Sequence, residues 1–152
     1  MKSIELQIGR ISQKNISAII GTSANKRQFI DGLVLQMLAY HSYEDLKLVV
    51  FTNEKNAPYW DYLKVSPHIW SNDKSTRYFA TNLDEAKEIS LTLEKAFQAR
   101  KFKDNNGKME QSGMDYRHYQ PYYVIFTDDY KGIRDIEIIK DVAESNLNYG
   151  FS

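Results

Sequence analysis

The sequence predicts an α/β domain with a mostly parallel central sheet and helices on both faces. Two strands are indicated by mostly apolar runs, residues 46–52 and 122–127, which do not alternate with polar residues. Strands of this kind are buried on both faces, as in parallel sheets that are covered by helices. Helical patterns separate the two runs, and such an order places the ligand-binding edge at the carboxyl ends of the strands.

The other elements follow from local patterns. The helix after the second strand has one wide apolar face, on which Leu33 is expected to join the core. Thr81 and Glu85 form a capping box that opens a later helix. In chain order we expect strands at 4–8 and 17–20, a helix at 26–41, a strand at 46–52, a helical stretch at 59–63, a strand at 77–80, a helix to about residue 100, a mobile loop at 101–112, a strand at 122–127 and a helix at 135–146.

Composition indicates a single globular domain of 152 residues. Its 20 basic and 20 acidic residues cancel, so no overall field attracts it to nucleic acid or to anionic lipid. The absence of cysteine excludes a disulfide framework and a thiolate metal site, which suits a reducing compartment. No apolar run is long enough to span a bilayer, and no signal-peptide core follows Met1, so we expect this piece to be soluble.

The turn between the second strand and the first helix resembles a phosphate-binding loop that lacks key residues. A functional loop follows G-x-x-x-x-G-K-[ST], where the Lys reaches the phosphates and the hydroxyl binds Mg²⁺. Gly21 and Lys26 are present, but no glycine precedes Lys26, the loop is one residue short, and Arg27 occupies the hydroxyl position. The pattern indicates an NTPase-like domain that has lost, or nearly lost, the reaction. A simple helix N-cap at this turn is the alternative.

Two acidic residues, Asp128 and Asp129, follow the strand at 122–127. In P-loop enzymes, the first such residue holds Mg²⁺ and the next can polarise the attacking water. The alternative is an ordinary turn, since aspartate is a common turn former. Gly21, Lys26, Asp128 and Asp129 are therefore the vestigial candidates for cofactor binding, and no catalytic or metal-binding residue is predicted.

Two further groups of residues have weaker functional interpretations. His41, His68 and His118 are scattered without the spacing of a zinc pair and are expected to be structural or surface residues. The tyrosine-rich segment 114–123 could bind a partner or a base, or could instead cover the edge of the sheet.

Several runs carry a resemblance to a known family. They are residues 29–36 (FIDGLVLQ), 41–46 (HSYEDL), 67–70 (PHIW), 121–130 (PYYVIFTDDY) and 143–150 (AESNLNYG). From Gly21 onward the chain resembles an ATPase module of the FtsK/SpoIIIE type, and specifically those of the EssC/EccC proteins of type VII secretion systems. Residues 43–46 and 67–70 most resemble the degenerate module that precedes the first typical ATPase module.

This resemblance implies a three-layer, RecA-like P-loop NTPase fold, with residues 1–152 as one degenerate domain of a longer, membrane-anchored protein. It implies a non-catalytic module on the cytoplasmic side of the bacterial membrane, with ATP and Mg²⁺ used by the parent family and no cofactor in this domain. The implied partners are neighbouring ATPase modules, membrane segments and other secretion-system subunits of a homo-oligomeric parent. No nucleic acid is expected.

Two alternative functions stay open. The first is an active module in which Lys26 and Asp128 still hold a nucleotide weakly. The second is an unrelated α/β module that binds protein or nucleic acid, which would be favoured if Gly21 and Asp128 lay at distant edges of the sheet. The fold hypothesis is that the strands that end at Gly21 and Thr127 are parallel neighbours or near-neighbours in one sheet, with both loops at the same edge. Ile125 is expected in the core.

Overall fold

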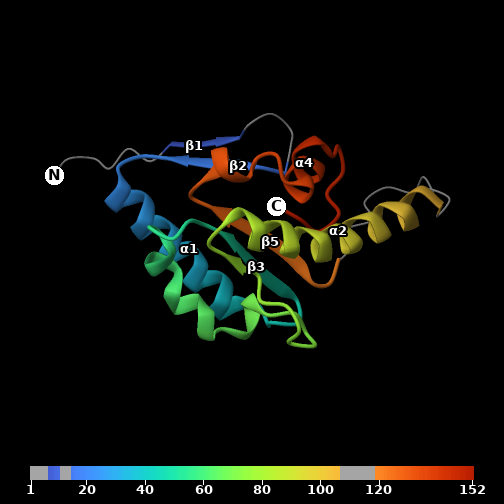
Figure 1. Cartoon of the computed structure of the whole chain (residues 1–152), viewed down its shortest axis with the longest axis horizontal. Helices are drawn as coiled ribbons and strands as arrows, with labels where there is room; N and C mark the ends of the chain where they lie inside the picture. Colours follow the sequence, from blue (N-terminus) through green and yellow to red (C-terminus); the bar gives the residue numbers. More distant parts are fainter. Residues whose placement is uncertain (1–6, 11–14, 107–118) are drawn as a thin grey trace.

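The structure, a computed structural model, describes residues 7–10, 15–106 and 119–152. Figure 1 shows strands and helices alternating along the chain. The elements are β1 (Gln7–Arg10), β2 (Ser17–Ile20), α1 (Ser23–Tyr40), β3 (Leu46–Phe51), the 3-10 helices η1 (Ala57–Val65) and η2 (Pro67–Ile69), β4 (Phe79–Ala80), α2 (Leu83–Asn106), β5 (Tyr122–Thr127), α3 (Tyr130–Ile133) and α4 (Glu137–Glu144). The predicted α/β class is confirmed.

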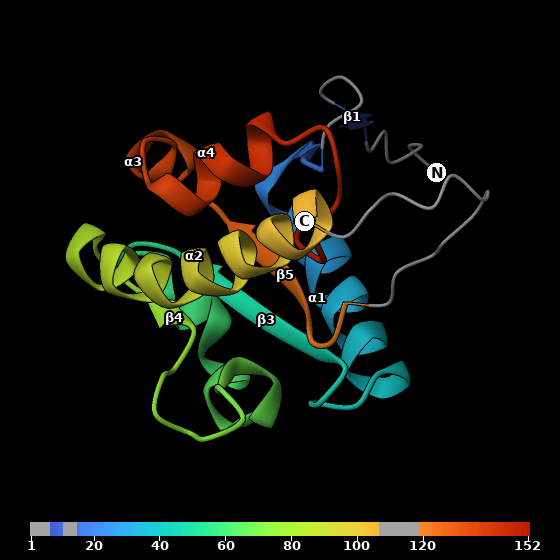
Figure 2. The same ribbon diagram turned by 90° about the vertical axis from the view of Figure 1, so that its right-hand side faces the viewer.

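The main sheet has three parallel strands in the order β4, β3, β5. All six residues of β3 are buried, which confirms the prediction of a strand covered on both faces. Helices α1 and α2 lie on opposite sides of this sheet (Figure 2). In β5 only Tyr123 is buried, because this strand has a hydrogen-bonded neighbour along its full length on one side only.

Strand β2 does not belong to this sheet. It pairs antiparallel with β1 in a separate two-stranded ribbon, with Gln7 opposite Ile20. Antiparallel pairing with a strand so close in sequence needs only a short connection, whereas pairing with β5 would close a loop of about a hundred residues. The expectation that β2 and β5 are parallel neighbours or near-neighbours in one sheet is therefore wrong. The chain forms an α/β fold with a small parallel sheet, and it is not clearly a full P-loop domain.

The outer edge of β5 is partly occupied by the last residues of the sequence. Phe151 forms a parallel bridge with Tyr123. The Tyr123 N–H donates to the Gly150 carbonyl at 2.8 Å, and the Ile125 N–H donates to the Ser152 carbonyl at 2.7 Å. These bonds use the edge on which β2 was expected.

Some boundaries differ from the predictions. Helix α1 begins at Ser23 rather than at residue 26. Helix α2 continues to Asn106, because Lys101 and Lys103 are good helix formers. Residues 101–106 of the expected loop are thus helical, while residues 107–112 of that loop lie outside the described part. Residues 4–6 of the expected first strand also lie outside it. The helix expected at 135–146 is α4, which is shorter and preceded by the single turn of α3.

The hydrophobic core is centred on β3, with one fully buried residue from α1. That residue is Val34, whereas Leu33 is only half-buried, so the choice of Leu33 as the core position is wrong. A three-stranded sheet covers only part of the wide apolar face of α1, and Val34 is at its centre. Ile125 is half-buried and packs against the core.

The tyrosine-rich segment covers the end of the sheet. Tyr123 stacks on Phe151 with ring centroids 4.8 Å apart, and Tyr119 packs edge-on against Tyr149 at 6.3 Å. Residues 119–123 are buried or half-buried, apart from Gln120. They therefore support the structural interpretation of this segment, and its residues 114–118 lie outside the described part.

One half-buried arginine joins three parts of the chain around these rings. Arg100 of α2 donates to the Tyr149 carbonyl and to the Pro121 carbonyl, both at 2.8 Å. Its guanidinium lies over the rings of Tyr119, Tyr123 and Phe151 at 5.2–5.5 Å. Burial lowers the pKa of Arg100, but an arginine remains charged throughout the physiological range.

Candidate functional site

The carboxyl ends of β3 and β5 lie side by side because Phe51 and Thr127 are register partners. Thr52 follows β3, and its hydroxyl donates to Asp128 Oδ1 at 2.8 Å. Trp60, from η1, donates its indole N–H to the other oxygen, Oδ2, at 2.9 Å. Both oxygens of the Asp128 carboxylate are therefore hydrogen-bonded within the protein. Asp128 is nevertheless exposed, as expected of an ordinary turn, and its two hydrogen bonds were not predicted.

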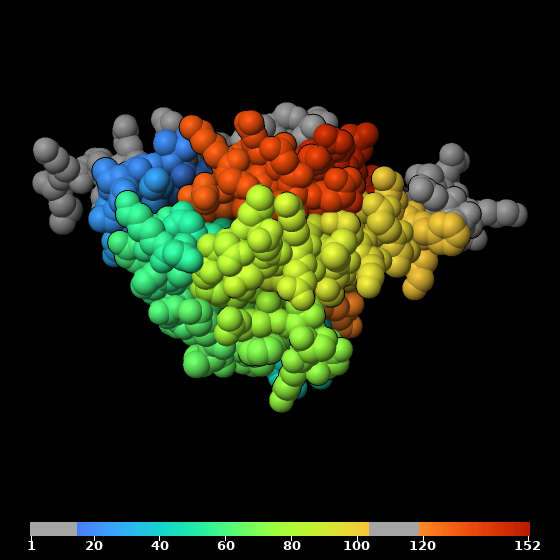
Figure 3. All heavy atoms as spheres, viewed as in Figure 1, coloured from blue at the N-terminus to red at the C-terminus, as the bar shows by residue number. Residues whose placement is uncertain are grey.

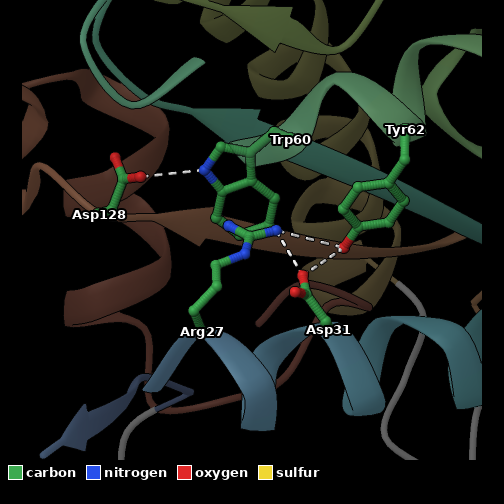
Figure 4. A network of polar contacts seen from close by, with 5 residues as sticks. All are labelled: Arg27, Asp31, Trp60, Tyr62 and Asp128. Atoms are coloured by element: carbon green, nitrogen blue, oxygen red, sulfur yellow. Dashed lines mark hydrogen bonds and ion pairs between the residues drawn. The ribbon is translucent and has the colours of Figure 1, made fainter. Parts of the chain in front are cut away.

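One face of the Trp60 ring is in contact with Arg27 of α1. The guanidinium carbon of Arg27 lies 4.4 Å from the ring centroid, a distance typical of a cation–π interaction. Arg27 also pairs with Asp31, one turn further along α1, at 2.5 Å. The Tyr62 hydroxyl donates to the same Asp31 oxygen at 3.0 Å. Figure 4 shows these side chains, which we call the Arg27–Trp60 lock: Arg27, Asp31, Trp60, Tyr62 and Asp128.

Within the lock, the surroundings of Tyr62 keep its hydroxyl protonated. Burial, followed by the hydrogen bond to Asp31, raises the pKa of Tyr62 to about 12. Tyr62 is thus a neutral donor at physiological pH. Arg27 and Asp31 form an ion pair in which each side chain is partly exposed, at 22% and 39%, so the aromatic stacking adds to a pair that would be weak alone.

The start of α1 has the geometry of an ordinary helix N-cap. Only Gly21 and Thr22 separate β2 from α1, so Lys26 lies in the first turn of the helix and not in a loop. The Thr22 hydroxyl accepts from the Asn25 N–H at 3.4 Å, and the Thr22 carbonyl accepts from the Lys26 N–H at 2.9 Å. The N–H groups of residues 25 and 26, which a phosphate loop would direct at its ligand, have partners inside the chain.

The remaining candidate residues have structural roles or no contact. Asp129 caps α3, where its side chain accepts from the Gly132 N–H at 3.4 Å. The side chain of Lys26 is half-buried and forms no hydrogen bond or ion pair with any residue that the structure describes. The structure thus brings Arg27 and Asp128 together across Trp60, and it leaves Lys26 and Asp129 outside that contact.

Sequence reasoning did not identify Thr52, Trp60, Asp31 or Tyr62 as parts of this site. The spacing of Arg27 and Asp31, four residues apart on a helix, is a readable signal for an ion pair. The contact of Trp60 with Asp128 has no local signal, because 68 residues separate them and only the tertiary fold places η1 at the end of β5.

Two of the family-like motifs meet at the opposite, amino-terminal end of the sheet. His68 Nε2 donates to the His41 carbonyl at 2.8 Å, and its Nδ1 lies 3.1 Å from the Ser66 hydroxyl. Lys47, which is 1% exposed, donates to the Pro67 carbonyl at 3.4 Å. Burial lowers the pKa of Lys47. These contacts give the motifs a packing role.

Metal binding finds no support in the described part. Among its residues, no three His, Asp or Glu side chains converge to hold a metal ion. His68 is a buried structural residue and His41 contributes its backbone carbonyl, while His118 lies outside the described residues.

Comparisons with known proteins gave one relative. No protein-family model and no solved structure matches the chain. The chain is 21% identical over 131 residues to the ESX secretion system protein EccC of Geobacillus thermodenitrificans (strain NG80-2). The match covers 84% of this chain but only 8% of that protein's length. This similarity supports, at the coarsest level, a relation to the family of type VII secretion ATPases.

Proposed function

We propose that this chain is a non-catalytic, P-loop-like module of a type VII secretion motor, where it couples the membrane part to the active ATPase modules. The observation that carries the proposal is the Arg27–Trp60 lock, in which Arg27 and Asp128, two residues at P-loop-like positions of the sequence, both contact Trp60. The relation to EccC supports the secretion role.

Mg²⁺ would need oxygen ligands from two parts of the chain. An active site supplies a hydroxyl from the start of the helix and a carboxylate from the end of a strand. Here Arg27 replaces the hydroxyl with a fixed positive charge, and Asp128 accepts hydrogen bonds from Thr52 and Trp60. A cation would have to approach beside the guanidinium and compete with both donors.

The phosphates of a nucleotide would need a binding site at the start of α1. Phosphate binding at a helix N-terminus needs free backbone N–H groups and room for the anion. The N–H groups of Asn25 and Lys26 are bonded to Thr22, and the Trp60 ring lies against the first turn of α1 through Arg27. The active-module alternative is therefore disfavoured by the same geometry.

A fixed lock suits a coupling role. It joins α1, η1 and the end of β5 through side-chain contacts, which hold the three segments in one arrangement. A module of this kind transmits movement between its neighbours as a rigid body.

The proposal also covers the partners, the cofactors and the location of the parent protein. The partners are neighbouring ATPase modules, membrane segments and other subunits, and ATP and Mg²⁺ act in the parent protein. The parent places this module on the cytoplasmic side of the membrane. Within the described part of the chain, no helix is long and apolar enough to cross a bilayer.

The experiment is a secretion assay with the full-length parent protein. Lys26→Ala is expected to leave secretion within about twofold of wild type, since Lys26 has no part in the lock. The matched control is the corresponding Lys→Ala change in the phosphate loop of an active module, which is expected to abolish secretion. Loss of secretion by Lys26→Ala, with normal protein levels, would show that the loop is functional and would contradict the proposal.

A further inference from the structure

A shallow groove runs between α2 and the segment that connects α3 to α4. Its α2 side includes Glu88, Leu91 and Glu94, and its other side consists of Asp135, Ile136 and Glu137. Figure 3 shows the face on which the yellow atoms of α2 meet the orange and red atoms of the chain from α3 onward. The groove lies on different elements from the Arg27–Trp60 lock.

The groove combines apolar and acidic character. Leu91 is 60% exposed in it, a large fraction for a leucine on a helix that is packed against a sheet. Four carboxylates and one lysine, Lys87, line the groove, although the whole chain carries no net charge. The lining of the groove therefore has more acidic than basic side chains around an exposed apolar one.

The carboxylates of the groove are not neutralised by strong internal pairs. Asp135 lies 3.8 Å from Arg134, and Glu137 lies 3.9 Å from Lys140, and all four side chains are well exposed. Such pairs contribute little. Nearby, burial raises the pKa of Asp141, Glu137 and Glu94 raise it further, and the hydrogen bond from Gln98 and the charge of Lys101 lower it.

The walls of the groove are firmly built. The Ser90 hydroxyl, which is buried, donates to Glu94 and accepts from the Ile138 N–H at 3.2 Å, and so it ties α2 to the start of α4. Gln98 donates to Asp141 at 3.0 Å, one turn further on. The two sides therefore present Leu91 and the carboxylates at a fixed separation, which lowers the entropic cost of binding.

We propose that this groove binds a basic polypeptide segment in which one leucine-like side chain is flanked by lysines or arginines. Charge complementarity selects the occupant, because the surrounding carboxylates match cationic side chains while Leu91 contacts the apolar one. The groove is open to solvent along its length, so it would bury only a small part of a small molecule. An anionic partner such as nucleic acid or lipid headgroups is excluded by the sign of the charge.

The test uses the full 152-residue chain, labelled with ¹⁵N, and a capped synthetic peptide, Lys-Lys-Ala-Leu-Lys-Lys. We expect saturable shifts of backbone amides in residues 87–94 and 135–137, with a Kd on the order of 100 μM. The same peptide with Ser in place of Leu, and one with Glu in place of every Lys, are expected to bind at least about fivefold more weakly.

Protein variants separate this groove from general attraction. Leu91→Ser and Glu88→Lys are expected to weaken binding at least about fivefold, while the exposed controls Leu35→Ser and Glu54→Lys leave it unchanged. Each folded variant is recognised by its dispersed spectrum. Absence of saturable shifts, shifts spread over the surface, or equal losses in the controls would overturn the proposal. A dimer in sedimentation that Leu91→Ser dissociates would also overturn it, because the occupant would then be a second copy.

Discussion

Replacing Trp60 with alanine is expected to lower the free energy of unfolding by about 3–5 kcal/mol. The indole is 3% exposed, packs against Phe126 with ring centroids 5.8 Å apart, and separates Arg27 from Asp128. Its removal leaves a cavity under α1, next to the Arg27 guanidinium. It also removes one hydrogen-bond donor to the Asp128 carboxylate. The measurement is a urea unfolding curve monitored by circular dichroism.

Two variants show which part of Trp60 matters. Trp60→Phe keeps most of the ring and loses the N–H, so it is expected to cost about 1–2 kcal/mol. Trp70→Ala is a control at the other tryptophan, which is only half-buried, and a smaller loss is expected there. A loss below about 1 kcal/mol for Trp60→Ala would mean that the lock does not hold α1 on the sheet.

The second large effect is expected at Arg100. Arg100→Ala should lower the free energy of unfolding by about 1.5–3 kcal/mol, because it leaves the part-buried carbonyls of Pro121 and Tyr149 without their charged donor. Arg100→Lys should recover only a minor part, since an ammonium cannot reach both carbonyls in the fork geometry of a guanidinium. Urea unfolding measures both variants.

Hydrogen exchange gives a local readout for the same change. The N–H groups of Tyr123 and Ile125 donate to Gly150 and Ser152, so their protection is expected to fall in Arg100→Ala. Arg134→Ala is the control, because Arg134 is 62% exposed and its only ion pair among the described residues is weak, and it should change stability by less than about 0.5 kcal/mol. An Arg100→Ala protein as stable as wild type would show that the aromatic cluster alone fixes residues 149–152.

The sequence predicted those elements whose cause is local or periodic. Strands β3 and β5 were predicted from apolar runs, and a parallel sheet from the intervening helices, and both are confirmed. The pairing of β2 was not predictable, because the same four-residue strand can join a nearby hairpin or a distant sheet, and proximity along the chain decided between them. Leu33 and Val34 are adjacent in a helix that is apolar on a wide face, so only the packed structure distinguishes which one is buried.

The candidate site was predicted in its position but not in its contacts. Arg27 at the hydroxyl position and Asp128 after a strand were both read from sequence, and both contact the lock residue Trp60. Trp60 itself was placed only in an aromatic helical stretch, since its two partners are far away in sequence. Gly21, Lys26 and Asp129 remain unassigned to any function, because the structure gives them capping roles or no partner among the described residues.

The most direct test of the central claim, that the lock takes the place of a nucleotide, is a calorimetric titration of the 152-residue chain with ATP in the presence of Mg²⁺. We expect no saturable heat up to about millimolar ATP, because Arg27 and Asp128 both contact Trp60 and the N–H groups of Asn25 and Lys26 are bonded to Thr22. A micromolar affinity for Mg-ATP that Lys26→Ala abolishes would contradict it.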